Sequence, residues 1–439
     1  MLMVNDHRSH DLSAERRPTP SPKRVTRWWV FPVTLFVLSR IWCISALYVG
    51  AWYFPVQSDF KDLNPHAGTY DDLPQYYRDY AARLPDYGRY PLLGVNAGGR
   101  WSDFAPFVHW DALWYLSVVE VGYQADTEAP TQQNPAFFPV FPLAVRALSF
   151  LGAPTIPAAI LLANLGTLAA SCLFYHFVRR TYGEPAARWS LLFWLFHPMG
   201  FFGSVPYADS FLAVCTIAAM NAVTQQRHLL AGLWCGIATA VRPPALALAG
   251  LFLPAIVGKS QSTKTRTNSF VGMCLSGLGI AMYFAYLGYE FGDPLLYLHT
   301  KWYDPPSMSG LNPLRWLKTI AGGIIGVFLL LFRPETPPLE LYSGRVADPL
   351  LFVWALAWLP AVRRFGAGIW FFTILACLMP LMSIESTASY GRYMWVVMPV
   401  FLAASTKLAG KPSGWATLIF FAAGQFMLAM WFGGGWVVI

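Results

Sequence analysis

Long apolar runs recur along this chain, and they constrain its fold more than any other feature of the sequence. Short basic or Pro/Gly-rich breaks separate the runs, each of which is roughly 15–25 residues long, close to the length that crosses a bilayer. Hydrophobic residues make up 56% of the 439 residues and charged residues only 12%, which excludes an ordinary soluble domain. The sequence therefore predicts an all-α polytopic membrane protein.

Basic residues beside the apolar runs predict how the chain is threaded, because Lys and Arg favour the cytoplasmic side. Residues 1–27 are expected to form a disordered basic cytoplasmic tail, and 28–435 the transmembrane domain. Within it, 54–155 is predicted to be a long first outer loop and 290–347 a second large outer loop. About 11 transmembrane helices are expected at roughly 20 residues each. The first begins at 28, and others lie near 156–178, 187–203, 208–224, 269–288, 348–362, 366–382, 392–408 and 413–432.

Two segments do not fit a single span. Residues 229–257 are too long and break at Pro243-Pro244, so two short helices are expected to meet outside at Arg242. Residues 319–332 are apolar but lie in the second outer loop. They are read as an interfacial or re-entrant helix, because a span there would put Arg363 and Arg364 outside.

Cysteine and charge usage narrow the class of partner. All six cysteines lie in apolar runs and none forms a Cys-x-x-Cys pair, so neither disulfides nor thiolate metal sites are expected. The net charge of +8 is spread over short loops beside the spans, which is no signal for nucleic acid.

The first outer loop contains the stretch "FVHWDALWYLSVVEVGY" at 107–123, in which a carboxylate stands beside aromatic rings. A helix starting near Trp110 would place its aromatics in the interfacial belt and lie along the membrane. A second interfacial helix is expected around Phe137–Phe141. Asp111 is the first acidic residue at the apolar boundary. From the residues alone it can be a helix cap or a functional carboxylate, and both readings stay open.

Several motifs appear in order along the chain. They are "HWDALWYLSVVEVGY … NPAFFPVFPL", "HPMGFFGSVPYADSFLAV", "GIATAVRPPAL", "FGDPLLYLHTKW" and "SYGRYMWVVMPVFL". Together they resemble the GPI mannosyltransferase II (PIG-V-type) family and its bacterial relatives, over residues 30–435. Departures from the family pattern are His109 before Trp-Asp in place of Arg, Asp209 in place of Glu, and Lys301 in place of Gln.

The resemblance implies a GT-C-type fold and a membrane glycosyltransferase. Such an enzyme would move a hexose, expected to be mannose, from a polyprenyl-phosphate sugar to a lipid-linked or glycan acceptor, with inversion, on the non-cytoplasmic face. The alternatives are a polytopic transporter or lipid flippase and a non-catalytic membrane subunit. A transporter would show a polar path across the bilayer, whereas the charges here gather on the predicted outer side.

Transfer with inversion needs a base for the acceptor hydroxyl and positive charge for the departing phosphate. Asp111 is the predicted catalytic base. The residues predicted to bind the donor's phosphate or sugar are Arg242, Arg392, Lys301, His299, Trp110 and Tyr115. Secondary candidates are Asp209, near the start of a span, and Arg40, deep inside the first span, because charges within a membrane are costly and often functional. Helix capping, snorkelling and structural pairing remain alternative roles for these charges.

No cofactor is required, because side chains alone can neutralise a monophosphate leaving group. A divalent metal is not indicated, although Asp103, Asp111 and Asp126 share one loop. The expected partners are the polyprenyl-phosphate sugar, the acceptor and membrane lipids, with no nucleic acid. The chain carries no clear organelle signal, so plasma membrane and endoplasmic reticulum both fit. In either, the active site is expected on the non-cytoplasmic side.

Overall fold

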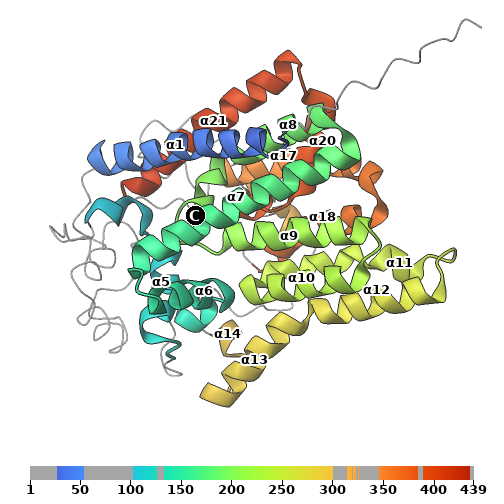
Figure 1. Ribbon diagram of the computed structural model, residues 1–439, viewed down its shortest axis with the longest axis horizontal. Coiled ribbons are helices and arrows are strands. Elements are labelled where there is room, and N and C mark those ends of the chain that lie inside the picture. The colour runs from blue at the N-terminus through green and yellow to red at the C-terminus, as the bar shows by residue number, and fades with distance from the viewer. Residues whose placement is uncertain are drawn as a thin grey trace, which may run out of the picture.

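The structure is a computed structural model, and it is helical throughout the residues that it describes (Figure 1). These are residues 27–53, 102–125, 133–299, 314–318, 320–322, 325, 346–383 and 389–435. Within these ranges there is no β-strand. The tail 1–26, most of the first outer loop at 54–101, Asp126, Lys301 and most of 319–332 lie outside the described residues, so the predictions for them stay predictions.

The helices follow one another with short connections; η marks a 3-10 helix. The first half comprises α1 (Val30–Tyr53), η2 (Ser102–Phe107), α5 (Asp111–Val121), η3 (Asn134–Ala136), α6 (Val140–Phe150), α7 (Thr155–Tyr182), α8 (Glu184–Leu195), η4 (Pro198–Gly203) and α9 (Asp209–Thr224). The second half comprises α10 (His228–Val241), η5 (Pro243–Leu251), α11 (Leu253–Val257), α12 (Thr263–Ser276), α13 (Leu278–Phe291), α14 (Leu296–His299), α17 (Ala347–Val362), η7 (Arg363–Phe365), α18 (Ala367–Ser383), α19 (Tyr390–Trp395), α20 (Met398–Leu408) and α21 (Pro412–Gly433).

Four described segments are long and apolar enough to cross a membrane by length and composition: Val30–Tyr53, Thr155–Tyr182, Thr263–Phe291 and Pro412–Gly433. Several large apolar side chains on them are exposed, among them Ile41, Leu161, Met282 and Ile419. Such surfaces suit lipid rather than water. The protein is therefore an all-α membrane protein, and the predicted number of about 11 spans stays a prediction.

The predicted break after residue 241 is confirmed. Helix α10 ends at Val241, Arg242 is in an extended conformation (φ −158°, ψ 141°), and the 3-10 helix η5 begins at Pro243. Proline has no N–H to donate and its ring clashes with the preceding turn, so two consecutive prolines end an α-helix. The break leaves Arg242 between two helices, where its side chain is free to point along neither.

Small residues set the closest helix contacts. Gly232 of α10 packs against Gly272 of α12, and a Cβ added at Gly232 would lie 2.6 Å from the Gly272 Cα atom. Helices α1 and α21 meet in the same way, with Gly50 against the Met430 carbonyl group. Close backbone approach through small residues is typical of helices packed in membranes, where hydrophobic burial cannot drive association.

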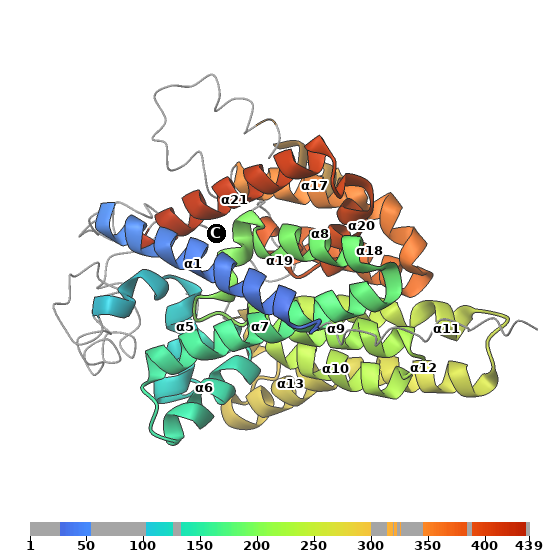
Figure 2. The same cartoon turned by 45° about the horizontal axis from the view of Figure 1, so that its top comes forward.

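The two ends of the molecule differ. Helices α5 and α6 lie together at one end, and the connection between α11 and α12 lies at the opposite end in both views (Figures 1 and 2). The interfacial helices expected in the first outer loop thus exist as α5 and α6. All six cysteines are free thiols.

Candidate functional site

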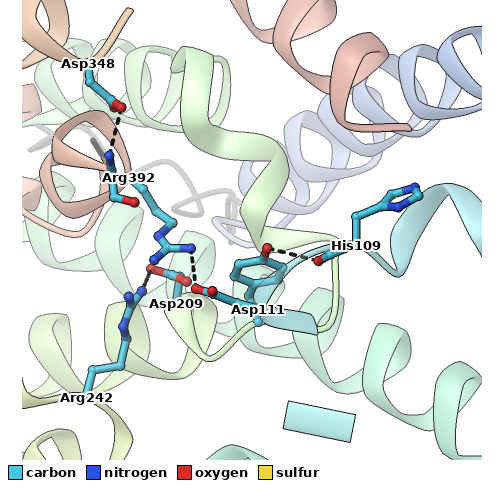
Figure 3. A network of polar contacts seen from close by, with 8 residues as sticks. His109, Asp111, Asp209, Arg242, Asp348 and Arg392 are labelled. Carbon is cyan, nitrogen blue, oxygen red and sulfur yellow. Dashed lines mark hydrogen bonds and ion pairs between the residues drawn. The ribbon is translucent and has the colours of Figure 1, made fainter. Parts of the chain in front are cut away.

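Four charged side chains from four separate segments form one cluster (Figure 3). Asp111 begins α5, Asp209 begins α9, Arg242 follows α10 and Arg392 lies in α19. Arg392 points toward both carboxylates, and Arg242 reaches Asp209 from the other side (Figure 3). The structure therefore brings together four residues that the sequence analysis singled out separately.

The cluster consists of two ion pairs. Nη1 of Arg392 donates to Oδ2 of Asp111 at 2.8 Å, and Nη1 of Arg242 donates to Oδ1 of Asp209. The Asp111 side chain is 17% exposed, whereas that of Asp209 is 1% exposed. Both carboxylates neutralise a guanidinium, but only Asp111 keeps an opening that another molecule could reach.

Aromatic rings enclose the two guanidinium groups. The Cζ atom of Arg392 lies 5.2 Å from the ring centroid of Phe202 and 5.3 Å from that of Tyr207. Tyr393 stands beside both arginines, with its ring centroid 5.3 Å from Cζ of Arg242 and 6.0 Å from Cζ of Arg392. Cation–π attraction grows when water is excluded, so these rings hold the cations in place while lowering the local dielectric constant.

The approach to α5 places the Asp111 carboxylate in the cluster. Trp110, directly before it, has φ 55° and ψ −121°, a conformation that a bulky residue rarely adopts. The Tyr207 hydroxyl donates to the carbonyl oxygen of His109 at 3.1 Å and so fixes the entry to the helix. In the described chain the Asp111 carboxylate binds Arg392 and makes no hydrogen bond to the start of its own helix. The capping role considered for Asp111 is thus not the one that the structure shows.

Asp348 is a site residue that the sequence analysis did not identify. It lies in the first turn of α17, is fully buried, and accepts hydrogen bonds from the backbone N–H groups of Ser389 (2.8 Å) and Gly391 (2.7 Å). A signal was present: "ADPLLFVW" has an aspartate at the start of an apolar run, as do Asp111 and Asp209. Asp348 does not touch the charges directly, but it lies next to the segment that carries Arg392 (Figure 3).

Arg40 lies elsewhere. Its Nη1 atom donates to the carbonyl oxygen of Gly200 (3.2 Å) and to Oγ of Ser204 (2.9 Å), and within the described chain it forms no ion pair. Those contacts tie α1 to the segment 198–208, which carries Phe202, Tyr207 and the approach to Asp209. The structural partner considered for Arg40 is therefore present, and no contact between Arg40 and the charge cluster is found among the described residues.

The remaining predicted binding residues differ in placement. Trp110 is half-buried and packs against the core, and Tyr115 is buried against Phe137 and Phe141. Burial raises the pKa of the Tyr115 hydroxyl, although Arg242 and Arg392 act in the opposite direction. Because its ring is covered, Tyr115 is better suited to position α5 than to stack on a sugar. His299 ends α14, and the orientation of its side chain is not described.

His109 adds no positive charge to the site. Burial lowers the pKa of its imidazole to about 4, so the ring is neutral near pH 7. The ring packs edge-on against Phe432, with a centroid separation of 5.4 Å. The cations that a phosphate could meet in the described cluster are therefore Arg242 and Arg392.

No group of three or more His, Cys, Asp or Glu side chains with metal-binding geometry occurs in the described ranges. Each of the two carboxylates in the cluster is instead paired with an arginine. Guanidinium groups favour phosphate and carboxylate ligands because they can donate two parallel N–H bonds. The arrangement can bind an anion beside a carboxylate that accepts protons.

Comparison with protein families gives a match to the family described as Mannosyltransferase (PIG-V) over residues 100–289, somewhat less than half of the chain. Residues 100–289 are a PIG-V-type mannosyltransferase segment. The match confirms the resemblance carried by the sequence motifs up to that point. The PIG-V segment contains Asp111, Asp209 and Arg242, while Arg392 lies beyond it. Together with the apolar helices, the match supports a membrane mannosyltransferase. No curated protein matches the chain in a sequence comparison.

Proposed function

We propose that this protein transfers mannose from a polyprenyl-phosphate sugar to a lipid-linked or glycan acceptor, with inversion, on the non-cytoplasmic face of the membrane. The observation that carries the proposal is the Asp111–Arg392 ion pair, because it sets a partly open carboxylate beside an enclosed phosphate-binding group. The PIG-V match supplies the sugar class. The need for a lipid-borne donor follows from the site's place among apolar helices.

In this proposal the two arginines bind the phosphate that leaves. An anion arriving near Arg392 competes with Asp111 for the guanidinium group, and Arg242 lies on the other side of the same cluster. Charge that develops on the phosphate oxygen is stabilised most where water is excluded, and the aromatic rings around Arg392 provide such surroundings. The N-termini of α5 and α9 add partial positive charge at the same place.

Asp111 acts as the general base. The acceptor's hydroxyl oxygen attacks the anomeric carbon, its proton passes to the Asp111 carboxylate, and the electron pair of the breaking C–O bond leaves with the phosphate. Asp209 is less suited to this role because its side chain is almost fully buried and paired with Arg242. When the phosphate draws Arg392 away, Asp111 regains its capacity to accept a proton.

The test is the Asp111→Asn variant, assayed with radiolabelled polyprenyl-phosphate mannose and a lipid extract. General-base catalysis contributes about 100-fold to 10,000-fold, so we expect the variant to lose at least about 100-fold in turnover. Its melting temperature should stay near that of the wild type, because the amide keeps the shape of the carboxylate. The matched control is Glu120→Gln, an exposed carboxylate on the same helix, which should transfer at the wild-type rate.

Two results would contradict the proposal. A folded Asp111→Asn variant with wild-type transfer would remove the catalytic role of Asp111. Lipid or sugar flux across sealed vesicles, in the absence of any sugar transfer, would instead favour a transporter.

A further inference from the structure

A fully buried carboxylate holds the backbone next to Arg392. Asp348 is 0% exposed, and its two oxygens accept N–H bonds from different residues, Oδ2 from Ser389 at 2.8 Å and Oδ1 from Gly391 at 2.7 Å (Figure 3). Burying a carboxylate is costly unless its oxygens are hydrogen-bonded, and bonds from N–H groups to a charged acceptor are stronger than neutral ones. The contact therefore requires an acceptor with two oxygens and not merely a small polar side chain.

The segment that Asp348 holds has an unusual backbone. Ser389 has φ 65° and ψ 2°, a left-handed conformation that costs a non-glycine residue free energy. At Gly391 a Cβ atom would lie 2.8 Å from Oδ1 of Asp348, so only glycine lets the backbone approach the carboxylate this closely. The carboxylate, the left-handed serine and the glycine together form one tight turn, which leads directly into Arg392.

Apolar packing alone already joins these two helices. Phe352 of α17 and Tyr390 of α19 are in contact, with their ring centroids 5.0 Å apart. A buried carboxylate adds what apolar contacts do not, namely a fixed direction for two particular N–H groups. Because Arg392 follows Gly391 immediately, that direction decides where the guanidinium group begins its reach toward Asp111.

We propose that Asp348 is a positioning residue that fixes Arg392 through the turn at 389–391 and thereby sets the affinity for the donor's phosphate. The inference rests on the proposed function, because it assigns the phosphate to Arg392. Asp348 itself touches neither the phosphate nor the reacting atoms. Its effect should therefore depend on the presence of the Arg392 guanidinium.

The experiment measures binding of polyprenyl phosphate, without sugar, to the full-length protein in detergent micelles. In Asp348→Asn the amide oxygen accepts one N–H, while the amide NH₂ faces the other N–H, so the turn loses its geometry. A misplacement on the order of 1 Å costs about 100-fold in comparable sites, and we expect the Kd to rise by at least about tenfold. The KM for the donor should rise in parallel, and the KM for the acceptor should change by less than about twofold.

The decisive comparison uses an Arg392→Ala background. If Asp348 acts through Arg392, Asp348→Asn should cause no further loss of phosphate binding there, whereas a general structural defect would add to the loss. Should Asp348→Asn fail to fold, Gly391→Ala tests the same contact from the other side, because its Cβ displaces the carboxylate. The matched control is Ser190→Ala, which removes a buried hydrogen bond to Oγ of Ser405 (2.9 Å) away from the site and should leave the Kd unchanged.

The outcomes separate the two proposals. If Arg392→Ala binds polyprenyl phosphate as tightly as the wild type, the phosphate site of the proposed function is wrong. If Arg392→Ala weakens binding but neither Asp348→Asn nor Gly391→Ala does, only the positioning role of Asp348 is overturned. An equal loss from Asp348→Asn in both backgrounds would also overturn it.

Discussion

Asp209 and Arg242 show how tightly charge is balanced in the cluster at the scale of single residues. Their side chains are 1% and 10% exposed, so neither can turn to water for solvation. The positive charge of Arg392 also acts on Arg242, against the attraction of Asp209. Each carboxylate is thus needed to keep two neighbouring cations in one place. Removing one partner of a buried pair costs more than removing both, because the remaining charge stays buried without compensation.

We therefore predict that Asp209→Asn lowers the free energy of unfolding by about 3–5 kcal/mol, the usual cost of a broken buried pair. The double variant Asp209→Asn/Arg242→Gln should lose less than Asp209→Asn alone, because no unpaired cation remains. Thermal unfolding in detergent, followed by tryptophan fluorescence, measures both. Strictly additive losses would show that the two side chains do not stabilise each other.

At the scale of elements, the site depends on helix ends that hold one another closely. Helix α10 carries Arg242 at its C-terminal end and packs along α12 through Gly232 and Gly272. Protein interiors are close-packed, so even one methyl group between two backbones forces the helices apart. A shift of α10 would then be passed to Arg242, although the glycines lie far from it along the helix.

The matched pair Gly232→Ala and Gly277→Ala tests this packing. A Cβ at Gly232 would lie 2.6 Å from the Gly272 Cα atom, whereas at Gly277 it would lie 3.6 Å from the Cys274 carbonyl oxygen, an ordinary contact. We expect Gly232→Ala to destabilise the protein by about 1–3 kcal/mol, the usual cost of overpacking. Gly277→Ala should be neutral or slightly stabilising, because alanine restricts the unfolded chain. Equal melting temperatures for the two variants would show that the helices can separate without cost.

At the scale of the whole molecule, the two ends of the helix bundle carry different chemistry. The end with α5 and α6 holds the charge cluster, whereas the α11–α12 connection at the opposite end is flanked by Lys259, Lys264 and Arg266. Basic residues beside membrane helices favour the cytoplasm, so this polarity supports placing the site on the non-cytoplasmic side. A donor whose sugar is displayed on that face could then reach Arg392 while its chain stays in the bilayer.

Labelling of single cysteines tests the orientation. In a variant without the six native cysteines, Leu151→Cys lies between α6 and α7, where the native side chain is 80% exposed, and Gln261→Cys lies between α11 and α12. A membrane-impermeant maleimide applied to intact cells or to sealed vesicles of known orientation should label residue 151 from the non-cytoplasmic side. It should reach residue 261 only after permeabilisation. The reverse pattern would place the site on the cytoplasmic face.

Local patterns were enough to predict most of the described helices and several site residues. The lengths of the apolar runs placed α1, α7 and α21 within a few residues, and Pro243-Pro244 located the break beside Arg242. Hydrophobic length and proline chemistry act on neighbouring residues, so the sequence displays them directly. The position of Asp111 at an apolar boundary was visible for the same reason.

What only the tertiary structure decided is which charges meet. Asp111 pairs with Arg392, which is 281 residues away, and Asp348 binds a turn 41 to 43 residues further along the chain. Such pairing depends on how the helices pack, and no local periodicity records it. The same holds for Arg40 and Tyr115, whose burial and neighbours assign them to the support of the fold. Sequence alone determined where the helices lie and which charges stand at their ends, because those properties are local. The packing of helices distant in sequence determined the partner of each charge.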